Sequence, residues 1–218
     1  MSLSKKIDKL LELKADVAVI QECEQELPAL PGEVSSIWRG NDTRKGICIL
    51  SFGESIKLDR SFDDTWTYFL PINANGFKIL AVWAYNHRAS RFGDDKHGYL
   101  LKVVPRLSAW IDNSNTLIMG DFNNSAVWNK PRSENNFTDI SSCIEGMGFK
   151  SAYHEFSGEE YGVESEATFY HTKQREKQYH IDYCFYPEGR ELENVQVGKY
   201  SDWIEYSDHA PVIVDIDL

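Results

Sequence analysis

Four short groups of polar residues each bring a carboxylate, an amide or an imidazole to the end of a predicted strand. They are Gln21-Glu22, Gly120-Asp-Phe-Asn123, His180-Ile-Asp182-Tyr183 and Ser207-Asp-His209. Carboxylates bind hard divalent cations and can take a proton from water. An imidazolium beside an acid can bind a phosphate oxygen. Together the four groups indicate metal-assisted hydrolysis of a phosphate ester.

Each group alone would be weak, because acids and amides at strand ends are common in ordinary turns. The elements that carry the groups make the pattern stronger. Apolar runs predict strands, and apolar residues at helical spacing predict helices. The predicted strands are 16–21, 46–52, 65–72, 77–85, 116–121, 181–186 and 211–216, and the predicted helices are 4–14, 97–111 and 137–147.

Local signals set several boundaries. Ser4 is expected to cap the first helix, and Asn75-Gly76 is expected to form a hairpin turn. Residues 40–45 are expected to form a polar turn, and 155–166 an exposed acidic loop. Strands mixed with helices and hairpins predict an α/β fold with two packed sheets and helices outside. The strand ends of such a fold gather in one place.

The bulk composition fits one domain over residues 1–218. The chain has 42% hydrophobic and 26% charged residues, and no apolar stretch approaches the roughly 20 residues of a membrane span. Its formal net charge of -11 argues against tight binding to long duplex nucleic acid. Four cysteines without CxxC spacing indicate reduced thiols and a cytoplasmic location.

The four groups, in this order, resemble the motifs of the endonuclease/exonuclease/phosphatase superfamily, which includes enzymes like exonuclease III and deoxyribonuclease I. The resemblance runs from about residue 16 to the end of the chain. It implies a four-layer α/β sandwich with two mostly antiparallel sheets. It also implies cleavage of phosphoesters with Mg²⁺ or Mn²⁺.

The resemblance implies a role for each matching residue. Glu22 and Asp208 resemble the metal-binding acids. Asp121 resembles the aspartate that activates the attacking water, and Asn123 the asparagine that holds water or a phosphate oxygen.

The remaining matches concern the phosphate. His209 resembles the histidine that contacts the scissile phosphate, and Asp182 the carboxylate that orients it. Tyr85 lies where relatives keep a residue near the leaving group, although His87 could replace it. Strand alternation predicts that His180 faces the same way as Asp182 and contacts phosphate.

Other residues fit less closely. Phe169 and Tyr179 match positions of aromatic pocket residues in abasic-site nucleases, but packing is the simpler interpretation of Phe169. Arg44 and Lys45 could reach phosphate, but we expect a solvated turn there. We expect His154 in a surface loop.

The sequence departs from the family at its start. Relatives begin with a strand carrying an asparagine, and this chain begins in the helix that follows. We therefore expect an N-terminally truncated domain with an artificial Met-Ser-Leu start. Loss of that strand would leave an unpaired groove, through which the chain could dimerise.

The leading hypothesis is a metal-dependent, nuclease-like phosphodiesterase. One alternative is a phosphatase of inositol phosphates or other small phosphoesters, for which Arg88, Arg91, Lys96, Lys130 and Arg132 are the basic candidates. Another is a catalytically impaired binding module, favoured only by the missing asparagine.

Overall fold

The structure is a computed structural model. It describes residues 3–30, 32–53, 55–62, 68–74, 76–84, 100–111, 115–133 and 136–217. The predictions for Tyr85 and His87, and for the basic residues Arg88, Arg91 and Lys96, lie outside the described residues.

A three-stranded antiparallel sheet forms from the first part of the chain. Its order is β1-β3-β2, with β1 at Val17–Cys23, β2 at Val34–Asp42 and β3 at Lys45–Phe52. The polar turn predicted over 40–45 is shorter, because β2 extends to Asp42 and pairs with Lys45, which leaves only Thr43 and Arg44 as the turn. Gly40, Asn41 and Asp42 hid this strand in the sequence, since such residues are rare in strands.

A six-stranded sheet forms the centre of the molecule, in the order β4-β5-β6-β7-β11-β8. All its pairs are antiparallel except β6 with β7. In the β5–β6 hairpin Ala74 pairs with Phe77, and Asn75 of the expected turn lies outside the described residues. The strands are β4 Ile56–Leu58, β5 Phe69–Ala74, β6 Phe77–Trp83, β7 Thr116–Asp121, β8 Phe149–Ser151 and β11 Asp182–Pro187.

Two small antiparallel pairs complete the described strands. One joins β12 (Leu192–Val197) to β13 (Val212–Ile216), and the other joins β9 (Phe169–Tyr170) to β10 (Gln178–Tyr179).

The described helices are short: α1 Ile7–Leu11, α2 Leu100–Leu107, α3 Phe137–Glu145, α4 Ala152–Ser157 and α5 Tyr200–Trp203. The predicted helix over 4–14 is therefore too long. Ser4 lies in a separate 3-10 turn, and the N-cap of α1 is Lys6. None of the helices in the described ranges is long and apolar enough to cross a bilayer.

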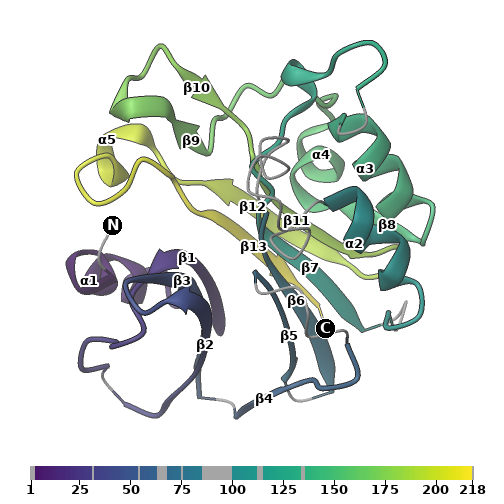
Figure 1. The fold of residues 1–218 in the computed structure, drawn as a ribbon. Helices are drawn as coiled ribbons and strands as arrows, with labels where there is room; N and C mark the ends of the chain where they lie inside the picture. Colours follow the sequence, from purple (N-terminus) through teal and green to yellow (C-terminus); the bar gives the residue numbers. More distant parts are fainter. Residues whose placement is uncertain are drawn as a thin grey trace.

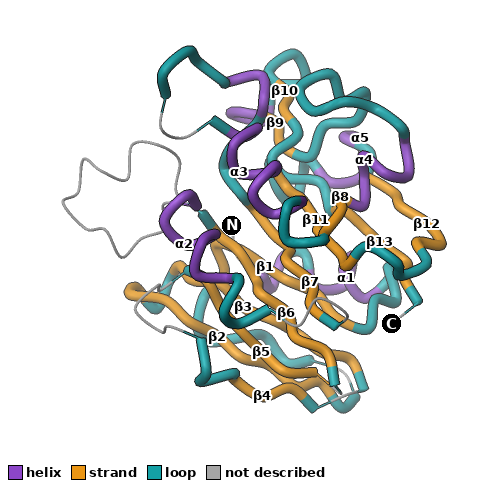
Figure 2. The backbone as a smooth tube through the Cα atoms, turned by 90° about the vertical axis from the view of Figure 1, so that its right-hand side faces the viewer, coloured by secondary structure: helices purple, strands orange, loops and turns teal. Residues whose placement is uncertain are grey.

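Three apolar layers hold these elements together. Helices α2 and α3 pack on one face of the central sheet through Val104, Ile140 and Phe185, among others. The opposite face packs on the small sheet and on the β12–β13 pair through Ile49, Leu70 and Val214. Ile7 of α1 packs on the outer face of the small sheet with Ile20. Figures 1 and 2 show this arrangement, so the four-layer α/β sandwich expected from the sequence is confirmed.

Candidate catalytic site

Two carboxylates face each other at the end of the central sheet. Asp121 ends β7 and Asp182 begins β11, and the two residues are direct partners in the antiparallel register. Asp121 is only 3% exposed. Burial and the neighbouring charge of Asp182 raise the pKa of Asp121 to about 8. A carboxyl group with this pKa can exchange protons near neutral pH.

His209 completes a three-residue group with these acids. Its Nδ1 donates a hydrogen bond of 2.9 Å to Oδ2 of Asp182. One ligand atom from each of Asp121, Asp182 and His209 lies within 4.8 Å of the others. Burial opposes a charge on His209, but Asp182 outweighs it and raises the histidine pKa to about 9. The imidazolium form therefore prevails at neutral pH.

Asn123 is folded back onto Asp121. Its backbone N–H donates to Oδ1 of Asp121 at 2.7 Å, and its side-chain amide donates to Oδ2 at 2.8 Å and to the carbonyl of Ala84 at 2.9 Å. These bonds hold Asn123 at a positive φ of 47°, a conformation that asparagine tolerates better than most residues. The sequence Gly-Asp-Phe-Asn therefore forms a turn whose hydrogen bonds hold the Asp121 carboxylate in place.

A β-bulge places Glu22 at the edge of this group. The register between β1 and β3 shifts from Gln21 to Cys23, and Glu22 has a φ of 56°. Bulges commonly redirect a side chain beside an active site. Next to the bulge, the Gln21 amide donates to the carbonyl of Val82 in the central sheet at 3.1 Å. This bond ties the two sheets together beside the site.

Gly120 allows this close approach of the two sheets. It has a φ of 136°, and a Cβ there would lie 2.1 Å from the Val82 carbonyl oxygen and 2.6 Å from the Gln21 amide nitrogen. Any larger residue would clash with the neighbouring strand β6 and with the Gln21 side chain of the small sheet.

Glu22 and Asp208 lie outside the three-residue group but near it. Both act on the ammonium of Lys6: burial lowers the pKa of Lys6, and the charges of Glu22 and Asp208 oppose that shift. Asp208 is anchored through its carbonyl, which accepts a bond of 2.8 Å from the Tyr170 N–H. The predicted metal-binding acids therefore lie at the rim of the group rather than within it.

The residues at hand suit a hard divalent cation. The donors are the carboxylates of Glu22, Asp121, Asp182 and Asp208, and oxygen ligands are those that Mg²⁺ and Mn²⁺ prefer. Asp121 and Asp182 are also adjacent, and burial together with the charge of Asp182 raises the pKa of Asp121. A nearby positive charge would oppose that shift.

Thr168 connects the segments that carry Asp182 and His209, a role that no sequence pattern predicts. The residue is fully buried. Its hydroxyl oxygen accepts bonds from the N–H groups of Ile181 and Asp182, at 3.0 and 3.1 Å. Its carbonyl accepts a bond of 2.8 Å from the N–H of Ala210. A threonine in an apolar run has no pattern that reveals such partners.

His180 does not face the site, so the expected phosphate contact is wrong. Strand alternation fails because β11 begins only at Asp182. His180 is 3% exposed, and its ring centroid lies 4.5 Å from that of Tyr153. Its Nδ1 donates a hydrogen bond of 2.8 Å to the carbonyl of Glu166. Burial lowers the pKa of His180, which favours a neutral ring.

His154 is also buried, against the expectation of a surface histidine. Its Nε2 lies 3.2 Å from Oε1 of Glu164, with side chains 9% and 4% exposed. Glu164 comes from the predicted exposed loop, so this loop is partly folded inward.

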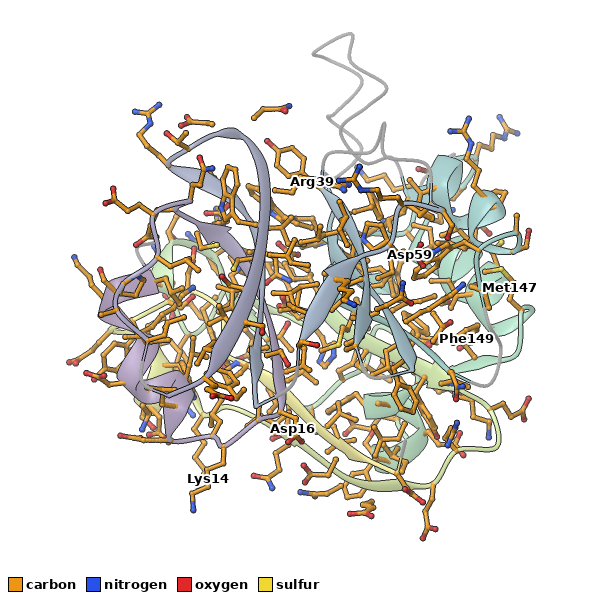
Figure 3. The ribbon with its side chains drawn as sticks, turned by 90° about the horizontal axis from the view of Figure 1, so that it is seen from below. Lys14, Asp16, Arg39, Asp59, Met147 and Phe149 are labelled. Carbon is orange, nitrogen blue, oxygen red and sulfur yellow. The ribbon has the colours of Figure 1, made fainter. Side chains whose placement is uncertain are left out.

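A groove of about 500 Å³ leads away from the site. Its two walls are the edges of β1 and β13, which in the described structure pair only with β3 and β12 respectively. Leu117, Met119 and Cys184 of the central sheet also line it. Gln21 and His209 mark the end at the site. Figure 3 labels Lys14 and Asp16 at the start of β1, at the opposite end.

Comparison with known proteins gives matches to solved structures. No protein-family model and no curated protein matches the sequence. The 3′-5′ exonuclease NExo from Neisseria meningitidis superposes with a TM-score of 0.73 at 18% identity, over 100% of this chain and 96% of that chain. The 3′ phosphatase NExo from Neisseria bound to product DNA hairpin matches over the same shares, with a TM-score of 0.68 and 16% identity.

Two further structures extend the comparison. The endonuclease domain of TRAS1, a telomere-specific non-LTR retrotransposon, has a TM-score of 0.67 and 15% identity, again over 100% of this chain and 96% of that chain. An endonuclease/exonuclease/phosphatase from Bacteroides vulgatus has a TM-score of 0.63 and 16% identity, over 99% of this chain and 91% of that chain. The chain therefore has the fold of the endonuclease/exonuclease/phosphatase superfamily.

Proposed function

We propose that this protein is a divalent-metal-dependent phosphodiesterase, nuclease-like, which hydrolyses its substrate by in-line attack of water. The observation that carries the proposal is the convergence of Asp121, Asp182 and His209 within 4.8 Å at the end of the central sheet. Glu22 and Asp208 would hold Mg²⁺ or Mn²⁺, which supplies positive charge to the phosphate.

His209 would bind the phosphate. Its Nδ1 is engaged by Asp182, so Nε2 of the imidazolium is the nitrogen that can donate to a phosphoryl oxygen. A charged donor of this kind stabilises the extra negative charge of the transition state. Asp182 contributes by holding the ring in place and favouring its charged form.

Asp121 would accept the proton of the attacking water. Asn123 holds both of its carboxylate oxygens, which fixes the direction of proton transfer. The high pKa of Asp121 makes it a strong base once ionised. Ionisation at neutral pH would be favoured by the cation held beside it.

A nucleic acid is the proposed substrate. One structural neighbour is a 3′ phosphatase bound to product DNA hairpin, and two others are a 3′-5′ exonuclease and an endonuclease domain. The net charge of -11 favours a strand end or another small target over long duplex. A small phosphoester, such as an inositol phosphate, is the second candidate.

The proposed cytoplasmic location rests on the four cysteines, which are all free.

The test compares hydrolysis of bis(p-nitrophenyl) phosphate with that of p-nitrophenyl phosphate in Mn²⁺. His209→Ala is the site variant, and His171→Ala is the matched control because His171 is exposed. Cleavage of the diester by the wild type and the control, but not by His209→Ala, would support the proposal. Metal binding without turnover of either ester, of DNA bearing a 3′-phosphate or of inositol phosphates would support a binding module instead.

We also propose that the groove between β1 and β13 accepts one further strand, supplied by a second copy of this chain. Both facing edges are unpaired in the described structure. A strand that pairs with either edge would satisfy its backbone N–H and C=O groups.

Amide hydrogen exchange and light scattering test the groove. An open groove predicts fast exchange of the outward N–H groups of β1 and β13 in a monomer, since unpaired edges are exposed to water. Slow exchange in a dimer would show that a second copy fills the groove. Slow exchange in a monomer would contradict the proposal, because the edges would already be paired within the chain.

A further inference from the structure

Lys45 stands beside the candidate catalytic site, at the exposed end of the β2–β3 hairpin. It is the first residue of β3, beside the bulge that redirects Glu22. Its Nζ lies 2.7 Å from Oε1 of Glu22, and the two side chains are 49% and 46% exposed. A second contact fixes its direction, because Nζ lies 5.4 Å from the centroid of the Trp83 ring.

Trp83 connects Lys45 to the buried acids. It ends β6 and is the register partner of Asp121. Its indole is only 3% exposed, so it is a fixed surface on which the ammonium can rest. The Lys45 ammonium is therefore one side chain away from Asp121, while half of its own surface remains open to solvent.

Two cations compete for Glu22 in this arrangement. Glu22 is one of the carboxylates proposed to hold the divalent ion, and in the present structure its partner is Lys45. A carboxylate oxygen that binds a divalent ion is no longer fully available to an ammonium, and two cations beside each other repel. Binding of the metal should thus release Lys45 from Glu22.

We expect the released Lys45 ammonium to contact the phosphate of the substrate. The described side chains around the site are mainly carboxylates, those of Glu22, Asp121, Asp182 and Asp208, and the partly buried ammonium of Lys6 lies near Glu22 and Asp208. A phosphodiester approaching these carboxylates needs positive charge besides the metal and His209. Lys45 is half-exposed and carries a mobile point charge on a flexible stem, which suits a contact with a phosphate oxygen.

We propose that Lys45 is a switching residue: in the metal-free protein it neutralises Glu22, and in the metal-bound protein it binds a phosphate oxygen of the substrate. This inference rests on the proposed function. It predicts opposite effects of Lys45 on the binding of metal and of substrate, which a lysine that only solubilises the surface would not have.

The test uses Lys45→Met, Lys45→Arg and the control Lys57→Met. Lys57 is an exposed lysine of β4, so its replacement removes the same charge at a distance from the site. Mn²⁺ affinity is measured by calorimetry on the protein alone. Lys45→Met should bind Mn²⁺ about twofold to fivefold more tightly, since a competing exposed ion pair is removed.

The second measurement is KM for bis(p-nitrophenyl) phosphate at saturating Mn²⁺. Lys45→Met should raise KM about threefold to tenfold with kcat little changed, because a hydrogen bond from a charged group to the substrate is lost. Lys45→Arg keeps the charge and should remain close to wild type in both measurements. Lys57→Met should change neither.

Each outcome decides one half of the proposal. An unchanged or weaker Mn²⁺ affinity in Lys45→Met would overturn the competition for Glu22. Tighter Mn²⁺ binding with an unchanged KM would overturn the phosphate contact. If none of the proteins hydrolyses the diester, the proposed substrate fails, while the calorimetry still tests the competition.

Discussion

Two histidine–carboxylate pairs in this protein have the same chemistry and opposite surroundings. His209 and Asp182 lie 2.9 Å apart at the end of a groove, with side chains 30% and 14% exposed. His154 and Glu164 lie 3.2 Å apart beneath the rings of Tyr153 and Tyr161, almost without exposure. The first pair can touch a substrate and the second cannot.

The difference shows that surroundings, not residue type, assign the roles. A histidine beside an acid is a candidate for catalysis only when an approach path is open. A buried pair instead fixes a loop, since leaving either partner alone in the interior is costly. The Glu164 carboxylate also accepts the N–H of Gly162 at 2.9 Å, which binds the 158–166 loop to α4 through His154.

Removal of the open pair, His209 and Asp182, should have the largest effect on activity. His209→Ala and Asp182→Asn should each lower kcat for a phosphodiester by about 10²–10⁴-fold, because an acid–base or charge-stabilising group is lost. Melting temperatures should fall less than after loss of the buried pair, because both side chains are partly exposed. Steady-state kinetics beside thermal unfolding checks this, and a variant with near-normal kcat would exclude its residue from the mechanism.

Removing the buried pair should have the reverse effect. Glu164→Ala should lower the free energy of unfolding by about 3 kcal/mol, since His154 and the Gly162 N–H lose their buried partner. The kcat of the folded fraction should stay close to wild type. Urea unfolding gives the stability, and kinetics on the folded protein gives kcat. A large loss of kcat without a loss of stability would place this pair in the catalytic machinery.

Thr168 supports the open pair from a fully buried position, because its hydroxyl binds the Asp182 N–H. Thr168→Val leaves the N–H groups of Ile181 and Asp182 without their acceptor, which should cost about 2 kcal/mol of stability. It should also lower kcat about tenfold or more, with KM little changed, because Asp182 is displaced. Thr168→Ser keeps the hydroxyl and should restore kcat. Equal loss in both variants would show that packing, not the hydroxyl, matters.

The two pairs should respond to opposite ends of the pH range. The pKa of His209 is raised from 6.5 to about 9, so its stabilising effect is full below pH 6.5 and disappears as the pH rises through 9. The pKa of Asp121 is raised to about 8, so between pH 4 and 8 this residue ionises more readily in the unfolded state. Its titration therefore lowers the free energy of unfolding further over that range. Burial would raise the pKa of Glu164, but bonds from His154 and Gly162 lower it, so its contribution is lost as the pH falls below 4.5.

Unfolding of the metal-free protein across this range tests the assignment. The wild type should lose about 1–2 kcal/mol between pH 6.5 and 9, and His209→Ala should show a smaller loss there. Glu164→Ala should flatten only the acid side. If His209→Ala keeps the full alkaline loss, the histidine is not the group that titrates.

Much of this protein was determined by its sequence alone. Apolar runs set most of the strands, because buried strands must be apolar on both faces. The polar groups that follow those runs, Asp121, Asn123 and His209 among them, could be recognised as candidates because strand ends of a sandwich gather at one edge. The four-layer fold was predicted from these motifs and is what the structure shows.

Only the tertiary structure decided which candidates meet. Asp121 and Asp182 are 61 residues apart in the sequence and become partners through the β7–β11 register. The prediction for His180 is wrong because β11 begins only at Asp182. The preceding residue, Ile181, is hydrogen-bonded to the Thr168 hydroxyl, a contact that the sequence does not reveal. The sequence does not reveal the contact between Lys45 and Glu22, because a β-bulge turns the Glu22 side chain toward Lys45. Registers, bulges and long-range hydrogen bonds depend on contacts between distant segments, and a local pattern does not contain them.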